Sequence, residues 1–266
     1  MSGEELARGE LIKPVQPDLT VDFVRHGEPE YTQQEIEDAS IEGQLTQEGK
    51  RQVQEAGLKL SGKIDKDKEL VVFLVSPKQR AHQTAAILNE VFQQQQIPVG
   101  RTRTYQALSD IRLDHVFIGR LLSENAVDKL IEFWAKTKLP EDTEKPEEVK
   151  KRVETVVAYL ERIARIITLQ DNKKLRVICV GHEEIFRDLL EEGFGIGTRN
   201  HSGPGYAEDM EMGIFKSEPG KDAVLKLAFR GLEAELGFNP QSKNFYKFKI
   251  PEKSTNNNYR EVEDDA

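Results

Sequence analysis

The sequence predicts an α/β fold with three layers, α/β/α, around a mostly parallel, doubly wound central sheet. Two observations carry this prediction. Short apolar runs rich in β-branched residues alternate with helical patterns, at residues 19–24, 70–75 and 175–180. The third run is almost uniformly apolar, which is typical of a parallel strand buried on both faces.

The intervening segments carry helix signals. Thr46 is a plausible N-cap for a helix whose apolar face contains Val53 and Leu60. Residues 76–79 read SPKQ, which combines an N-cap serine, a proline at the first helical position and a glutamine three residues after the serine. An apolar stripe over residues 149–167 predicts the longest helix and is interpreted as core packing.

The remaining segments set the domain organisation. Residues 212–216 and 223–229 predict a terminal strand pair, and the glycine-rich stretch 193–205 predicts a flexible loop. We expect one domain over residues 18–251, a flexible segment at 1–17 and a disordered tail at 252–266. Residues 109–147 are too long for a strand–helix connection. They are either a helical lid insertion, with its helical pattern at 127–134, or a surface excursion.

Composition excludes several classes of protein. The chain of 266 residues has a formal net charge of −9, which argues against general binding of nucleic acid. It contains no apolar run long enough to span a membrane, and its start lacks the pattern of a secretory signal. A single cysteine, Cys179, predicts a reducing compartment, and we expect a cytoplasmic protein. The histidines lack metal-ligand spacing, so neither a metal nor another cofactor is expected.

Charged and imidazole side chains follow the three predicted strands. Arg25 and His26 end the first, Arg80 lies in the first helical turn after the second, and His182 follows the third. Ligands of open α/β sheets bind outside the carboxyl ends of the strands, so these four side chains are expected to converge. Two arginines and two histidines form an anion site, for which a tetrahedral phosphate dianion is the natural occupant.

These residue types suit phosphoryl transfer. A neutral imidazole can attack phosphorus while arginine forks neutralise the charge on the phosphate oxygens. Gly27 lets the backbone turn tightly after His26. A carboxylic acid is still needed to protonate the leaving oxygen.

Four sequence blocks resemble, in order, the motifs of the histidine phosphatase superfamily, which is phosphoglycerate mutase-like. They are FVRHGE (23–28), LTQEGKRQ (45–52), SPKQRAHQTA (76–85) and VGHEE (180–184). The resemblance implies that His26 is the nucleophile of a metal-independent phosphatase with a phosphohistidine intermediate. It also implies that Arg25, Arg80 and His182 line the phosphate pocket. Gly27 is expected to bind substrate together with these three residues.

The chain departs from the family pattern in three places. Asp110 stands where the family usually has a glutamate as general acid, with Asp114 as a second candidate and Glu28 and Glu183 next in line. Residues 29–32 read PEYT, unlike the corresponding segment of the glycolytic mutases. Glu183 and Glu184 replace glycines that often follow the second histidine. A carboxylate there either repels a second anionic group of the substrate or points to solvent.

The resulting expectation is hydrolysis of a phosphomonoester on a small metabolite or a phosphoprotein. Mutase-type phosphoryl transfer and a non-catalytic phosphate-binding module remain alternatives, and the substrate and oligomeric state stay open. Several other residues are assigned structural roles: His82 and His115 as structural or solvated, His201 in a loop, Cys179 as a buried strand residue, and Ser76 and Thr84 in helix capping and packing.

Overall fold

The computed structural model of this chain describes residues 16–32, 34–35, 42–114, 116, 118–119, 140–196, 203–216 and 221–247. Several expectations lie outside the described residues and stay predictions. They are the flexible segment apart from Gln16 and Pro17, the tail, the helix at 127–134, and the roles of His115 and His201.

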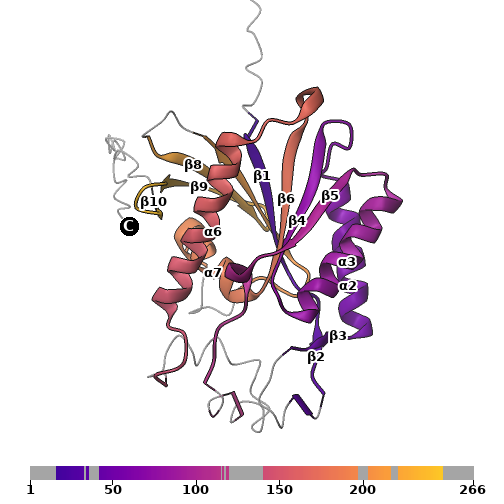
Figure 1. The fold of residues 1–266 in the computed structure, drawn as a ribbon, viewed down its shortest axis with the longest axis vertical. Coiled ribbons are helices and arrows are strands. Elements are labelled where there is room, and N and C mark those ends of the chain that lie inside the picture. Colours follow the sequence, from indigo (N-terminus) through magenta and orange to yellow (C-terminus); the bar gives the residue numbers. More distant parts are fainter. Residues whose placement is uncertain are drawn as a thin grey trace, which may run out of the picture.

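The described residues form one eight-stranded sheet with helices on both faces (Figure 1). Its strand order is β10-β9-β8-β7-β1-β6-β4-β5. The strands are β1 (Leu19–Arg25), β4 (Glu69–Val75), β5 (Val99–Thr104), β6 (Lys174–Gly181), β7 (Asp209–Phe215), β8 (Ala223–Phe229), β9 (Leu232–Asn239) and β10 (Asn244–Lys247). A short second pairing joins β2 (Pro29–Glu30) to β3 (Gln44–Leu45). The predicted α/β class is confirmed.

The sheet is mixed, and its two halves differ in direction. β1, β6, β4 and β5 pair in parallel. From β1 outward through β7, β8, β9 and β10 every pairing is antiparallel. The expectation of a mostly parallel sheet therefore holds only for the half built from β1, β6, β4 and β5. The connections that join β7, β8, β9 and β10 in succession are too short for a crossover helix, so these strands pair in antiparallel fashion.

Two apolar cores lie on opposite faces of the sheet. Alternate residues of β1 point in opposite directions, so Val21 and Phe23 enter one core while Val24 enters the other. The first core is covered by α6 (Pro146–Ile166) and α7 (Glu183–Phe194), and the second by α2 (Gln47–Ser61) and α3 (Gln79–Gln94) (Figure 1). This arrangement is the predicted three-layer architecture.

The predicted helix starts have different outcomes. Thr46 caps α2 as expected, with its hydroxyl oxygen accepting from the backbone N–H of Gly49. Ser76 is not the N-cap residue of α3, which begins at Gln79 with Lys78 as its N-cap, although the Ser76 hydroxyl oxygen accepts from the backbone N–H of Lys78 at 3.3 Å. The Ser76 backbone instead continues the sheet edge by donating to the carbonyl of Val180, and its hydroxyl is bound to a histidine described below.

No helix in the described part of the chain is long and apolar enough to cross a membrane.

Candidate active site

The carboxyl ends of β1, β4 and β6 lie side by side at one edge of the sheet, at the end of the molecule where β2 and β3 also lie (Figure 1). Two hydrogen bonds extend the pairing past the strands, from the His26 backbone N–H to the Gly181 carbonyl and from Ser76 to Val180. The residues that follow the three strands are therefore brought together, as the sequence predicts.

His26 is buried, with 5% of its surface exposed. Its Nδ1 lies 2.7 Å from the carbonyl oxygen of Gly27. A carbonyl only accepts, so Nδ1 carries the proton and Nε2 keeps its lone pair. Burial, reinforced by the positive charge of Arg80, lowers the pKa of His26 well below its ordinary value of 6.5. The side chain is thus a neutral imidazole with Nε2 available for attack.

Arg80, in the first turn of α3, links the site residues. Its Nε donates to Nε2 of His26 at 3.2 Å, and its Nη2 lies 3.2 Å from Nδ1 of His182 and 2.8 Å from Oδ2 of Asp110. Its Nη1 donates to the carbonyl of Glu42 at 2.6 Å. One guanidinium therefore connects both histidines and the candidate acid.

His182 is held in a single tautomer. Arginine always donates, so Nδ1 accepts from Arg80 and Nε2 donates to the Ser76 hydroxyl oxygen at 2.8 Å. Burial, followed by the positive charge of Arg80, lowers the pKa of His182 well below 6.5. The rings of His26 and His182 meet edge to face with centroids 5.1 Å apart. Both imidazoles are neutral beside a permanently charged guanidinium.

Arg25 lies at the rim of this cluster. Its Nη1 contacts Oε2 of Glu183 at 2.9 Å and donates to the Pro204 carbonyl at 2.7 Å. Its guanidinium stacks 4.3 Å above the centre of the Tyr206 ring, which also approaches His26 with centroids 5.8 Å apart. The Nε of Arg25 is buried and has no hydrogen-bond partner among the described residues.

Gly27 is required by a close approach of α2. An added Cβ would lie 2.5 Å from the carbonyl oxygen of Gly49 and 2.8 Å from a methyl of Val53. The physical reason thus differs from the tight turn expected, because Gly27 has no positive φ. Gly27 is expected to bind substrate, and its amide donates to the hydroxyl of Thr84 at 3.2 Å.

The candidate acids differ in the groups that they contact. Asp110, after the short helix η1 (Gln106–Leu108), contacts Arg80 and lies 3.9 Å from Nζ of Lys78. Asp114 accepts from the backbone N–H of Val116, and Glu28 accepts from the Thr46 hydroxyl. Of these carboxylates, Asp110 contacts the arginine that binds both histidines.

The two glutamates after His182 do not point freely into solvent. Glu183 pairs with Arg25, and Glu184 is buried, with its Oε1 accepting from the backbone N–H of Ile111 at 2.8 Å. Neither of the interpretations offered for these positions anticipated that Glu184 would contact the segment carrying Asp110.

Sequence analysis missed three contributors to the site. Ser76 binds His182, Thr84 binds the backbone after His26, and Tyr206 packs on Arg25. The serine and threonine were assigned to capping and packing because each has a sufficient local explanation. Their partners are 106 and 57 residues away, so local sequence carries no signal for them.

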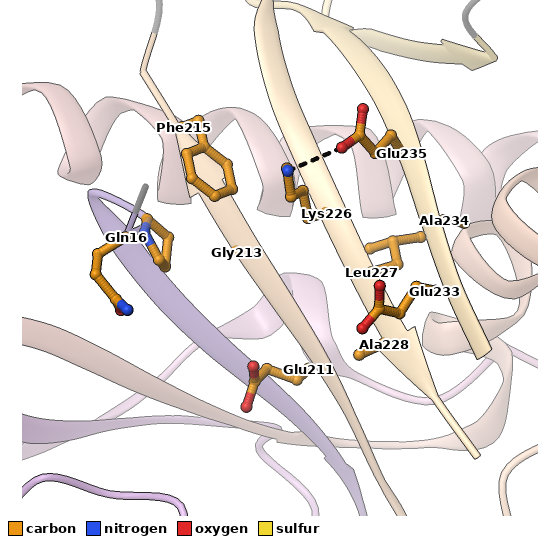
Figure 2. Close-up of a pocket in the computed structure, with 11 residues that line it drawn as sticks. Gln16, Glu211, Gly213, Phe215, Lys226, Leu227, Ala228, Glu233, Ala234 and Glu235 are labelled. Atoms are coloured by element: carbon orange, nitrogen blue, oxygen red, sulfur yellow. Dashed lines mark ion pairs between the residues drawn. The ribbon is translucent and has the colours of Figure 1, made fainter. Parts of the chain in front are cut away.

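A hollow lies on the open face of β7, β8 and β9, away from the strand-end site, and has a volume of about 740 Å³ (Figure 2). Its lining includes the Lys226–Glu235 ion pair and Phe215. No histidine lines it, so it lacks the nucleophile of the strand-end site. Among the described residues, no cluster of three or more histidine, cysteine or acidic side chains is arranged to hold a metal ion.

Comparison with known proteins shows the family of this sequence and the relatives of its fold. The family model of the histidine phosphatase superfamily (branch 1) matches residues 21–227. A search of curated proteins finds no match. Among solved structures, mycobacterial hydrolase 1 has a TM-score of 0.54 at 20% identity, with 81% of this chain and 99% of that chain covered. Mycobacterial glucosyl-3-phosphoglycerate phosphatase has a TM-score of 0.50 at 20% identity, with coverages of 75% and 92%.

At this identity the structural neighbours establish the fold, while the family match extends over all four sequence blocks and both histidines. The predictions of the family and of a phosphatase are confirmed, and the chain belongs to branch 1 of the histidine phosphatase superfamily.

Proposed function

We propose that this phosphatase hydrolyses a phosphomonoester through a covalent phosphohistidine formed at Nε2 of His26. The observation that carries the proposal is the state of His26: it is neutral, its proton is fixed on Nδ1 by the Gly27 carbonyl, and its Nε2 is contacted by a buried arginine. A nucleophile of this kind needs no separate base, because its attacking nitrogen carries no proton.

Phosphate binding would use the cationic groups around Nε2. Arg80 moves its N–H donors from the histidines to the phosphate oxygens, where their charge is best used in the transition state. Arg25 offers a buried Nε donor that has no partner among the described residues, and this supports an anionic ligand. His182 lies opposite His26 and completes the wall of the phosphate site.

The reaction has two balanced steps. Nε2 of His26 forms a bond to phosphorus while the bond to the leaving oxygen breaks, and protonated Asp110 gives its proton to that oxygen. Water then attacks phosphorus, the nitrogen–phosphorus bond breaks, and the Asp110 carboxylate takes a proton from the water. Inorganic phosphate leaves, and both side chains return to their starting states.

The proposed substrate is a small phosphorylated metabolite. One structural neighbour is a glucosyl-3-phosphoglycerate phosphatase, and the cluster of Arg25, Arg80 and the Tyr206 ring around the nucleophile suits a small phosphate ester. Arginine supplies the positive charge that a metal supplies elsewhere, so we propose activity without a metal ion. The cytoplasmic location stays a prediction.

The test is to trap the intermediate. Rapid quenching during turnover should isolate phosphate that is stable in alkali and labile in acid, as a phosphoramidate is. His26→Ala should abolish both the trapped phosphate and the activity. His82→Ala is the matched control, because His82 lies at the exposed side of α3, where its ring contacts Thr104.

The outcomes also distinguish the alternatives. Turnover by His26→Ala would overturn the mechanism. Phosphate binding without any covalent intermediate would favour a non-catalytic module. A requirement for a bisphosphate would favour a mutase.

A further inference from the structure

Asp110 lies in a segment with no regular secondary structure, directly after η1. An aspartate is also one methylene shorter than glutamate, so the position of its carboxyl group depends closely on that of its backbone. A general acid works only when its proton lies within hydrogen-bond reach of the leaving oxygen. The contacts that fix this backbone are therefore relevant to catalysis.

One contact comes from the first turn of α7. Glu184 is buried, with only 6% of its surface exposed, and its Oε1 accepts from the backbone N–H of Ile111 at 2.8 Å. Ile111 is the residue after Asp110 and is buried as well. Burial, with a contribution from the charge of Asp110, raises the pKa of Glu184 to about 7. A buried carboxyl group therefore accepts a hydrogen bond from the backbone amide that follows the proposed acid.

Further contacts come from α6. Arg152 donates through Nη1 to the carbonyls of Ala107, at 3.2 Å, and Ser109, and through Nη2 to that of Asp110 at 3.3 Å. Its guanidinium is held by both carboxylate oxygens of Glu144, at 3.0 and 2.9 Å. Glu144 in turn contacts Arg112 on the far side of the acid: its backbone N–H donates to the Arg112 carbonyl, and its Oε2 accepts from the Arg112 backbone N–H at 3.1 Å.

We propose that Glu184 and Arg152 are positioning residues that hold Asp110 at the leaving-group side of the phosphate pocket. This rests on the proposed function, with Asp110 as its acid. Arg152 binds the backbone through the carbonyls of residues 107, 109 and 110, and Glu184 binds it through the amide of residue 111. Together they fix the peptide on both sides of the Asp110 side chain, so the shorter acid delivers its proton from a rigid backbone.

The test compares two leaving groups. Glycerol phosphate needs a proton on its leaving alkoxide, whereas p-nitrophenyl phosphate releases a stable phenolate without one. Glu184→Ala should lower kcat for glycerol phosphate by about 10²-fold, the loss expected from a small misplacement. Its kcat for p-nitrophenyl phosphate should fall much less. Glu184→Gln retains an oxygen that accepts from Ile111, so it should restore hydrolysis of glycerol phosphate.

A measurement independent of activity accompanies the kinetics. Amide hydrogen exchange in residues 107–112 should speed up in Glu184→Ala and return towards the wild-type rate in Glu184→Gln. Glu161→Ala is the matched control, because Glu161 is also a buried glutamate but pairs with Arg165 on α6. Any loss of activity in that variant should be equal for the two substrates.

If Glu184→Ala does not fold, Arg152→Met tests the same proposal from α6, with the same selective loss expected. Equal losses on both substrates in the folded variant, or no loss, would overturn the positioning role. The failure of the proposed function is seen separately, because the wild-type enzyme would then yield no phosphoenzyme.

Discussion

The two halves of the sheet place their polar groups differently. In the parallel half, β1, β4 and β6 end at one edge, and the side chains that follow them are joined by Arg80 into a buried cluster. In the antiparallel half, charged side chains such as Lys226 and Glu235 are spread over the open face of β8 and β9, where they pair with each other in contact with solvent.

This difference follows from strand direction. Parallel strands bring all their carboxyl ends, and the helix starts after them, to the same place, which concentrates donors and positive charge. Antiparallel strands alternate their ends between the two edges. In the described chain, the antiparallel half reaches the site through the segment before β7, where Tyr206 packs on Arg25 and Ala207 donates to the carbonyl of His26. Its main contribution is the core behind α6 and α7.

Among the substitutions that compare the two halves of the sheet, one at Asp110 should cause the largest loss of rate. Asp110→Asn removes the proton donor, so hydrolysis of an alkyl phosphate should fall by about 10²–10⁴. Hydrolysis of p-nitrophenyl phosphate should fall much less, since its leaving group departs unprotonated. Steady-state kinetics on both substrates measure this difference.

Asp114→Asn is the control for that experiment, because Asp114 lies four residues later and accepts from Val116. A selective loss in Asp114→Asn, with Asp110→Asn unaffected, would move the acid to Asp114. Equal losses on both substrates in Asp110→Asn would show that the residue positions the substrate instead.

The next effect concerns Arg80. Arg80→Ala removes the group that contacts His26, His182 and Asp110, and the loss of one transition-state donor typically costs about 10²–10³ in rate. Wild-type activity should survive a strong chelator, because arginine supplies the positive charge at this site. A metal requirement, or an Arg80→Ala enzyme with normal rates, would mean that catalysis occurs elsewhere.

The sequence could predict most of the parallel half. A buried parallel strand leaves a run of apolar residues, and the polar residue that ends it is conspicuous, so His26 and His182 were found together with their strands. The outer strands were harder to predict. β5, at one edge of the sheet, and β9, next to the opposite edge strand β10, carry charged or polar side chains on their exposed faces. Their patterns are no more apolar than those of loops, and neither strand was predicted.

Long-range partners explain the remaining errors within the site. Ser76 follows a local capping pattern, but its hydroxyl forms a hydrogen bond with a histidine 106 residues away. Arg152 lies on the polar side of a helical stripe, where solvent exposure is the ordinary expectation, yet it binds the carbonyls around Asp110. Such contacts depend on which segments the fold brings together, and a single sequence does not contain that information.

A smaller effect is expected from pH. The pKa values of His26 and His182 are lowered by burial and by Arg80, so both stay neutral below pH 6.5. The acid-side fall of kcat/KM should therefore begin well below pH 6.5, and a fall centred at 6.5 would contradict a neutral, buried nucleophile.

The stability of the fold should also decrease as pH falls. The unfolded chain takes up protons on these histidines below pH 6.5 while the folded chain does not, so stability is lost as pH falls. Each histidine contributes about 1.4 kcal/mol per pH unit in that range. Denaturant unfolding of His26→Asn should show a weaker dependence on pH than the wild type. The described antiparallel half has no histidine, so this dependence belongs to the site.

The smallest effect is expected on the open face. Lys226 lies over the ring of Phe215 at 5.2 Å from its centre and pairs with Glu235 at 2.9 Å, but both charged side chains are 54% exposed. Exposed pairs contribute only about 0–1 kcal/mol, because solvent screens the charges and ordering two long side chains costs entropy. Lys226→Ala should therefore change the free energy of unfolding by no more than about 1 kcal/mol and leave kcat/KM unchanged.

Lys78→Ala is the matched comparison, since that lysine lies 3.9 Å from Asp110 at the parallel edge, and its loss should lower the rate. If Lys226→Ala lowered the rate and Lys78→Ala did not, substrate would bind in the hollow of Figure 2, and the assignment of function to the parallel half would be wrong.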